Sequence, residues 1–596
     1  MCGIIGYVSK KSDAIKVLIS SLKSLEYRGY DSSGIAYFND NKIKVVKEKG
    51  KIIELEKKLD YNMPSNIGIA HTRWATCGIA NKKNAHPHSS GNITIVHNGI
   101  IENYDALKKD LEKEGYKFLS ETDSEVIAVL LNKFYKEEKN FEKAILKARE
   151  VLIGSYALAI LCLDFPDTIF AIRKDSPLII AKNDYASFVA SDVPAILNYT
   201  NKYFILKENE IAILNNNNIK VIDENSKEVT KDFLTFEGDK NSSQKGSFEH
   251  FMLKEIFEEK NVIKNIMENY NSIDKLIKNL AFLKKYKKID IIACGSAYHV
   301  GIIAKYLLEE YAKIPIHVEV ASEYRYKDSF LDKESLAIFI SQSGETADTL
   351  ASLRKVKEQN IDTLGIINVV ESSIARETDN VIYTKAGPEI AVATTKAFIA
   401  QLIVIILITL YLSYEKNIIS KEFVEKTIYD LNNIDNYIDI LLNKSYKEIS
   451  SIIEKHDHVF FLGRNIDYGI ALEGSLKLKE ISYIHSEAYP AGELKHGTIS
   501  LIDNDTPVIS ILTKDSIFDK TVSNIKEVKA RGAYNIVIST KEVNIADKTI
   551  LIPNINELLL PIFATIPLQL IAYEVAKLRG CDIDKPRNLA KSVTVE

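Results

Sequence analysis

The sequence predicts a layered α+β domain followed by two doubly wound α/β domains. With 596 residues, the chain is too long for a single hydrophobic core, and about three or four domains are expected. The first 236 residues contain many short β-type runs, whereas the rest of the chain alternates strand and helix. The order of apolar strand, glycine turn and helix occurs twice in that second part, which indicates an internal repeat.

Residues 1–236 form the first predicted domain. Runs such as IIGYV, GIAYF and ITIVHNG are typical of strands, and helical patterns interrupt them at 11–27, 101–114 and 123–137. The segment EGDKNSSQKGS, residues 237–247, is polar and contains glycine and serine, as expected of a linker.

The repeat occupies the remainder, with a first copy at 248–425 and a second at 426–596. After a long helical region, the first copy has the strand KKIDIIAC before Gly295, and the second has the strand HVFFLG, which ends at Gly463. Alternation of this kind predicts parallel sheets covered by helices. Ligands of such sheets usually bind at the carboxyl ends of the strands, so the segments that follow strands are candidate sites.

Composition argues against several classes of protein. The 77 basic and 81 acidic residues give a net charge of −4, which provides no electrostatic reason to expect nucleic-acid binding. Five cysteines without a CxxC pair argue against a disulfide framework and a thiolate zinc site. The N-terminus lacks a signal-peptide pattern, and the apolar run at 397–412 is short for a membrane span and contains Gln401. We therefore expect a cytoplasmic protein without a membrane partner, in which this run is a buried helix.

The segment SQSGET directly follows the apolar strand SLAIFI and precedes a helical pattern. Its hydroxyl groups, its backbone N–H groups and a helix N-terminus would surround one point, which favours a phosphate site. The alternative is an ordinary N-cap, which needs only one serine. The second copy has TKDS at the matching point, so one phosphate site per chain is expected. Since no Walker A loop and no G-x-G-x-x-G motif follows a strand, the phosphate is expected to belong to a small substrate.

A possible acid–base group lies in EGSLKLKE, where Glu473, Lys477 and Glu480 share one helical face. A solvated, salt-bridged surface is the alternative interpretation. His496 follows in GELKHG, and together these groups could move protons between neighbouring carbons of a sugar phosphate. Lys591, in the polar C-terminal tail, is either part of a frayed end or an amine that forms a Schiff base with a ketose.

Loops of the N-terminal domain contain groups suited to an amino acid. Asn98-Gly99 is either a simple turn or a pair of donors for an oxyanion. Arg73 suits a carboxylate, and Asp123 suits an α-ammonium group. The HPH triplet at 86–88 has no further ligand at useful spacing, so a metal site is not expected.

Cys2 precedes the first β-type run. Removal of Met1 would give Cys2 a free α-amine beside its own thiol. Because an α-amine titrates near ~8 and a thiol near ~8.5, proton transfer between them costs little. The alternative is that a cysteine at this position has no function.

Long motifs resemble a known family. MCGIIGY, EYRGYDSSG, HTRWAT, NAHPH, HNGIIEN and SETDSEV are similar to the glutaminase domain of amidotransferases with an N-terminal cysteine nucleophile, a layered α/β/β/α domain. CGSAYH, SQSGET, GPEIAVATTKAF, EGSLKLKEISYIHSEAYPAGELKHG and PRNLAKSVTVE resemble the tandem sugar-isomerase domains of the glutamine:fructose-6-phosphate amidotransferases. The resemblance covers essentially the whole chain in the order expected of that family.

For the N-terminal half, the resemblance implies that Met1 is removed and Cys2 attacks the amide carbon of L-glutamine, with its α-amine as base. Asn98 and Gly99 would hold the oxyanion. The residues implied to bind glutamine or to order its loop are Arg73, Trp74, Thr76, His86 and Asp123. Trp74 would also gate an ammonia channel, unless it is simply a core aromatic residue.

For the isomerase half, the resemblance implies that Lys591 forms an imine with open D-fructose 6-phosphate. Glu480 would move a proton between the first two carbons beside Lys477, and His496, from the neighbouring subunit of a homodimer, would assist ring opening. The residues implied to bind the sugar phosphate are Ser296, Ser341, Gln342, Ser343, Thr346 and Thr394. The products would be D-glucosamine 6-phosphate and L-glutamate, in the first step of hexosamine synthesis, with no metal or organic cofactor.

The sequence departs from the family pattern at Cys77, where histidine is usual, and at Ala297, where serine is usual. Ser296 and Thr394 exchange serine and threonine relative to the common pattern, which should be nearly neutral. Three alternatives remain: a non-catalytic sugar-phosphate sensor, an isomerase with a decayed glutaminase half, and an amidotransferase for another acceptor. The acid–base residues argue against the first, and the lack of ATP-pyrophosphatase and phosphoribosyl loops argues against the third.

Overall fold

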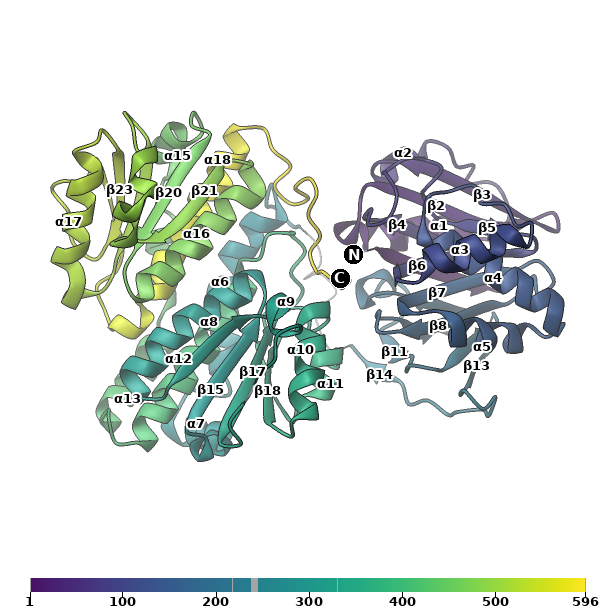
Figure 1. Ribbon diagram of the computed structural model, residues 1–596, viewed down its shortest axis with the longest axis horizontal. Coiled ribbons are helices and arrows are strands. Elements are labelled where there is room, and N and C mark those ends of the chain that lie inside the picture. Colours follow the sequence, from purple (N-terminus) through teal and green to yellow (C-terminus); the bar gives the residue numbers. More distant parts are fainter. Residues whose placement is uncertain (1, 217, 237–244, 330, 595–596) are drawn as a thin grey trace. The chain divides into compact units, whose positions relative to one another are not determined.

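The computed structural model describes residues 2–216, 218–236, 245–329 and 331–594 (Figure 1). The chain divides into two compact units, of which the first comprises Met1–Ser243 together with Ala590–Glu596 and the second comprises Gln244–Leu589. Most of the expected linker at 237–247 lies outside the described residues, which resume at Lys245.

The first unit has four layers, in the order helices, sheet, sheet, helices. One sheet has the strand order β14-β11-β9-β10-β1-β4-β2-β3, and the other has the order β13-β12-β8-β7-β6-β5. The strands of the first sheet are β1 (Gly3–Ser9), β2 (Ser32–Asn39), β3 (Lys42–Lys49), β4 (Ile67–Arg73), β9 (Ile179–Lys182), β10 (Ala186–Ala190), β11 (Lys202–Ile205) and β14 (Leu234–Thr235). Those of the second are β5 (His88–Ser90), β6 (Ile93–Ile101), β7 (Gly154–Cys162), β8 (Ile169–Lys174), β12 (Ile211–Leu214) and β13 (Ile219–Ile222).

The alternation of side chains along the strands creates these layers. On β1, Tyr7 packs against α1 and α2, whereas Ile4 packs into the core between the sheets. On β6, Ile95 packs against α4 and α5, whereas Val96 faces the other sheet. The helices of this unit are α1 (Ala14–Lys23), α2 (Ile52–Glu56), α3 (Tyr104–Lys113), α4 (Asp123–Glu138) and α5 (Phe141–Val151). The predicted α/β/β/α layering is thus confirmed.

The second unit contains two parallel sheets with the same strand order, which confirms the predicted repeat of doubly wound domains. Their orders are β16-β15-β17-β18-β19 and β21-β20-β22-β23-β24. The strands of the first are β15 (Lys288–Ala293), β16 (Ile316–Val320), β17 (Ser335–Ser341), β18 (Asp362–Ile367) and β19 (Asn380–Tyr383). Those of the second are β20 (His458–Gly463), β21 (His485–Pro490), β22 (Pro507–Leu512), β23 (Tyr534–Ser539) and β24 (Lys548–Leu551).

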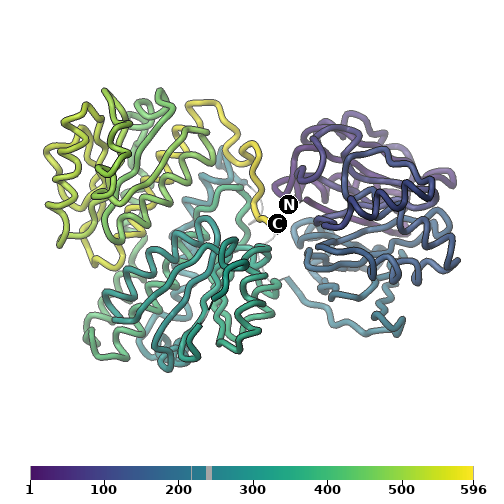
Figure 2. The backbone as a smooth tube through the Cα atoms, viewed as in Figure 1, coloured from purple at the N-terminus to yellow at the C-terminus, as the bar shows by residue number. Residues whose placement is uncertain are grey.

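Helices cover both faces of each sheet, and one continuous core joins the two copies. In Figure 2 the chain of this unit passes through the teal first copy before it enters the green second copy. The helices that contribute to the shared core include α6 (Phe251–Met267), α7 (Ile273–Leu280), α8 (Gly295–Leu307), α12 (Lys396–Glu415), α13 (Lys421–Asn432), α14 (Asp435–Leu442), α15 (Lys447–Ile453), α16 (Ile466–Ser482) and α18 (Leu560–Leu578). The opposite faces carry α9 (Ala321–Tyr324), α10 (Ala347–Glu358), α11 (Ser373–Glu377) and α17 (Phe518–Lys529).

Among the described residues, two segments of this unit are long and apolar enough to cross a membrane, namely Lys396–Glu415 and Glu557–Leu578. Each is 94% buried within the protein over its most apolar window. The first contains the run at 397–412, so the expectation of a buried core helix is confirmed. The second, which has Pro567 inside α18, was not anticipated.

Candidate active sites

Cys2 lies at the beginning of β1, a strand in the interior of its sheet, between β10 and β4. Its Sγ lies 3.4 Å from the backbone nitrogen of Trp74 and 3.5 Å from the Trp74 carbonyl oxygen. Burial raises the pKa of the Cys2 thiol, although the hydrogen bond from Trp74 and the charge of Arg73 oppose this shift. A thiol in this setting needs a proton acceptor before it can act as a nucleophile.

Asn98 and Gly99 lie on β6, and Asn98 reaches Cys2 from the second sheet. The Asn98 side-chain amide donates to the Cys2 carbonyl oxygen at 2.9 Å, and its Oδ1 lies 3.1 Å from Nε2 of His71. Gly99 has φ +128°, and a Cβ there would lie 2.0 Å from the Ser155 carbonyl oxygen. Only glycine fits this position, and the register with β7 continues through it, so Asn98-Gly99 lies within a strand and is not a two-residue turn.

Arg73, at the end of β4, binds the loop that follows its own strand. Its guanidinium donates to the carbonyl oxygens of Cys77, Gly78 and Ile79, at 2.5, 3.0 and 3.4 Å. Within this loop Thr76 is exposed and Trp74 is half-buried, so Trp74 is not a fully buried core residue.

Cys77, the departure in this loop, has its Sγ 3.5 Å from the carbonyl oxygen of Glu121. The loop is therefore anchored mainly through its backbone, since its carbonyl oxygens accept from Arg73 and the N–H of Ala75 donates to Asp31 at 2.8 Å. No histidine side chain is needed for the anchoring that the structure displays.

Asp123 and His86 are both buried close to β6. Asp123 is the first residue of α4, and its Oδ2 accepts a hydrogen bond from the N–H of Ile101 at 2.9 Å. His86 accepts from the N–H of His97 at 3.2 Å, and its ring stacks on His71 with centroids 4.0 Å apart. Burial lowers the pKa of His86 well below its usual value, so the ring is neutral. Among the described residues, no group of histidine, cysteine or carboxylate side chains has the arrangement of a metal site.

In the second unit, the SQSGET segment forms a tight turn between β17 and α10. The N–H of Gly344 donates to Ser341 Oγ at 3.0 Å, the N–H of Glu345 donates to Ser343 Oγ at 3.2 Å, and Thr346 Oγ1 lies 3.1 Å from Ser341 Oγ. Gly344 has φ +64°, and a Cβ there would lie 1.9 Å from the Ser372 hydroxyl. This turn brings Ser341, Ser343 and Thr346 together at the carboxyl end of a strand, as predicted.

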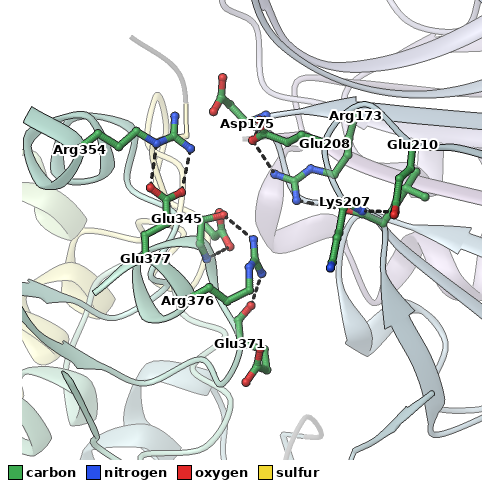
Figure 3. Close-up of polar contacts among 12 residues, drawn as sticks. Arg173, Asp175, Lys207, Glu208, Glu210, Glu345, Arg354, Glu371, Arg376 and Glu377 are labelled. Atoms are coloured by element: carbon green, nitrogen blue, oxygen red, sulfur yellow. Dashed lines mark hydrogen bonds and ion pairs between the residues drawn. The ribbon is translucent and has the colours of Figure 1, made fainter. Parts of the chain in front are cut away.

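Neighbouring elements hold this turn in place. The Glu345 carboxylate accepts from the N–H of Ser373 at 2.8 Å, and Gln342 accepts at its carbonyl from the N–H of Asn368. Arg354 of α10 forms a bidentate pair with Glu377 of α11 and so links these two helices (Figure 3).

The predicted acid–base residues of α16 meet Ser296 from the first copy. Lys477 Nζ lies 2.5 Å from Glu480 Oε2 and 3.5 Å from Glu473 Oε1, and it donates to Ser296 Oγ at 3.2 Å. Glu473 also accepts from Ser296 Oγ at 2.9 Å and from His299 Nδ1 at 2.8 Å. The Ser296 hydroxyl, expected at the phosphate, is thus bonded within the acid–base cluster.

This cluster is not a solvated surface, because the side chains of Lys477 and Glu473 are each only 1% exposed. Burial pushes the pKa of Lys477 down, but Glu480, Glu473 and Glu389 more than offset this effect and raise it. Lys477 is therefore a permanent cation, suited to stabilise negative charge rather than to accept a proton. The part played by His299 was missed from the sequence; its only signal was a place one helical turn after Gly295.

The remaining predicted residues lie apart from this cluster. His496 is exposed at the end of a short 3-10 turn (Glu493–His496), and its side chain forms no hydrogen bond or ion pair within the described chain. Lys591 belongs to the segment Ala590–Glu596, which groups with the first unit, so the second unit alone does not bring it to Glu480. Thr394 is half-buried just before α12.

A cysteine lies at the start of a four-layer domain, beside an amide donor. An acid–base cluster lies between paired parallel sheets. Together these features define a two-part enzyme, a glutaminase joined to sugar-isomerase domains. Models of the glutamine amidotransferase domain and the SIS domain match residues 71–198, and 282–411 with 451–579, respectively. The chain belongs to the glutamine–fructose-6-phosphate aminotransferase (isomerizing) family.

Curated relatives support this assignment over the full length. The chain is 47% identical over 611 aligned residues to the family enzyme of Clostridium tetani, and 46% identical over 611 to that of Clostridium acetobutylicum, with all of each chain covered. It is also similar to the solved C-terminal domain of glucosamine-fructose-6-phosphate aminotransferase from Francisella tularensis. The two share 41% identity with a TM-score of 0.54, over 58% of this chain and all of that domain.

Proposed function

We propose that this enzyme transfers the amide nitrogen of L-glutamine to D-fructose 6-phosphate and isomerises the product to D-glucosamine 6-phosphate, releasing L-glutamate. The observation that carries this proposal is the full-length relationship to the aminotransferase family, in a chain that retains residues for both half-reactions. The name of the family supplies the substrates, and the residue roles below are part of the proposal.

In the glutaminase half, Cys2 is the nucleophile once Met1 has been removed. Its thiol proton passes to its own α-amine, the sulfur attacks the amide carbon, and the α-ammonium returns a proton to the departing ammonia. Asn98 Nδ2 and the Gly99 N–H stabilise the oxyanion of the tetrahedral intermediate. Water then hydrolyses the thioester to glutamate.

Glutamine is held by its charged ends. Arg73 receives the α-carboxylate and Asp123 the α-ammonium group, while Thr76 and His86 order the surrounding loop. Trp74 contacts the Cys2 sulfur through its backbone, and its side chain would gate the path that released ammonia takes.

In the isomerase half, the turn from Ser341 to Thr346 binds the phosphate, assisted by Gln342 and Thr394. Lys591 condenses with C2 of the open ketose and releases water, and ammonia then displaces the lysine to give the imine of the substrate. Glu480 removes a proton from C1 and delivers it to C2, while the cationic Lys477 stabilises the charge that develops.

His496 is exposed and lacks a partner within the described chain, so a neighbouring subunit is the natural place for its action. We accordingly propose a cytoplasmic homodimer in which His496 of one subunit assists ring opening in the site of the other.

A paired product assay tests the proposal. Wild-type protein should form glucosamine 6-phosphate from fructose 6-phosphate with glutamine, and more slowly with ammonium. Cys2→Ala should lose glutamine-dependent synthesis and keep the ammonium-dependent or isomerase activity. Absence of amino sugar from the wild type under both conditions would refute the proposal.

A further inference from the structure

Helix α6, the first helix of the second unit, is capped by a residue from the other end of the chain. The N–H groups of Phe251 and Met252 donate to Oδ2 and Oδ1 of Asp584, each at 2.9 Å. The N-cap residue of this helix, His250, supplies no side-chain cap. The carboxylate satisfies two N–H groups that have no partner within the helix, and its charge complements the positive end of the helix dipole.

Asp584 also holds the segment that leads into α12. Its carbonyl oxygen accepts from the N–H of Val392 at 3.0 Å. Glu255, four residues into α6, accepts with Oε1 from the N–H groups of Ile390 and Ala391. Three successive N–H groups, those of residues 390–392, are thus bound to α6 or to the residue that caps it.

The same segment is fixed at its other end by its own acidic residue. Glu389 Oε1 accepts from the N–H groups of Thr395 and Ala397, both at 3.0 Å. The half-buried Thr394 lies between the two anchored stretches. Its position therefore depends on α6, and through Asp584 on the C-terminal segment.

We propose that Asp584 is a positioning residue for the amination reaction. It joins, at one point, the helix that follows the linker, the segment that carries Thr394, and the stretch that leads seven residues later to Lys591. This inference rests on the proposed function, because Thr394 and Lys591 are assigned to the sugar site by that function.

The chemistry of the cap requires a carboxylate. Asparagine offers one acceptor oxygen and turns an NH₂ group toward a second N–H, and alanine offers no acceptor. Neither change removes the carbonyl that accepts from Val392, so the test isolates the tie between α6 and the C-terminal segment.

The experiment uses the full-length enzyme as wild type, Asp584→Asn, Asp584→Ala and the control Asp582→Ala. The side chain of Asp582 is exposed and accepts from the N–H of Lys585. Three quantities are measured: KM for fructose 6-phosphate, the glucosamine 6-phosphate formed per glutamate released, and glutamate release without sugar. We expect Asp584→Ala to raise this KM about tenfold and to halve the product ratio roughly, with Asp584→Asn intermediate and Asp582→Ala unchanged. Glutamate release without sugar should not change in any variant.

Two results would overturn the inference. One is an Asp584→Ala enzyme with the wild-type KM and product ratio. The other is an equal loss of every activity, with a lowered melting temperature in both Asp584 variants, which would indicate only a structural role. Failure of the proposed function would appear differently, since the wild type itself would then make no amino sugar.

Discussion

Replacing Gly99 with alanine should silence the glutaminase half while leaving the isomerase half intact. The added Cβ would lie 2.0 Å from the backbone carbonyl oxygen of Ser155 on β7, whereas real Cβ contacts do not fall below 3.0 Å. Strands β6 and β7 would have to separate by about 1 Å, a displacement large enough to misplace a positioned group. The backbone N–H of residue 99 and the amide of Asn98 are the two proposed oxyanion donors, and they lie on the displaced strand.

The magnitude follows from the donors that would be lost. Removal of one oxyanion donor typically lowers kcat by about 10²–10³-fold, and here both would be displaced. We therefore expect glutamate release from glutamine to fall at least ~100-fold. Amino-sugar formation from fructose 6-phosphate with ammonium should stay within about twofold of the wild type, because the second unit is unchanged.

Gly115→Ala is the matched control. Gly115 has φ +89°, so alanine there meets the same kind of backbone strain, but no atom lies within 4 Å of the added Cβ. Strain alone costs about 1–3 kcal/mol and should reduce stability without selective loss of glutaminase activity. If Gly99→Ala released glutamate within threefold of the wild-type rate, the assignment of an oxyanion site to Asn98 and Gly99 would be refuted.

Three further changes test other parts of the structure. Lys477→Met leaves buried carboxylates without their cation, so we expect a stability loss of about 3–5 kcal/mol by denaturant unfolding and no amino-sugar formation, with glutamate release retained. Burial raises the pKa of Asp467 to about 7, so the folded state retains a proton that the unfolded state gives up above about pH 4. Stability should therefore fall as pH rises from about 4 to 7, by roughly 4 kcal/mol at most, and Asp467→Asn should flatten this part of a melting-temperature profile. Cys77→Ala should keep the glutamine KM within about threefold, because Arg73 binds the carbonyl oxygens of the loop; a tenfold rise would show that the thiol orders it.

Much of the fold could be predicted because local pattern and tertiary structure agree. The helical patterns at 11–27, 101–114 and 123–137 contain or closely match α1, α3 and α4, and the apolar run at 397–412 is the centre of α12. The edge strand β3, KIKVVKEK, was missed because its side chains are exposed or half-buried and charged, so hydrophobic alternation is weak there.

The sequence named candidate site residues, but it could not predict their hydrogen bonds. The family resemblance implied that Ser296 binds the sugar phosphate, yet its hydroxyl bonds to Glu473, 177 residues away. That contact arises because α8 and α16 pack together in the core shared by the repeats, and no local signal encodes it. His71, which lies 3.1 Å from the Asn98 amide oxygen, was missed for the same reason, since an orienting contact leaves no spacing pattern.

The duplicated fold divides its tasks unequally, and the structure gives a physical reason. Strand β22 occupies the place in its sheet that β17 occupies in the first, so Thr513 corresponds to the start of the SQSGET turn. In the second copy, however, the carboxyl group of Asp467 accepts from both the N–H and the hydroxyl of Thr513. Donors that a phosphate would require are thereby occupied by a side chain of the protein itself. The second copy instead supplies α16, whose Lys477 reaches across to Ser296 of the first copy. In the proposed function, binding groups from one repeat and acid–base groups from the other would therefore complete a single sugar site.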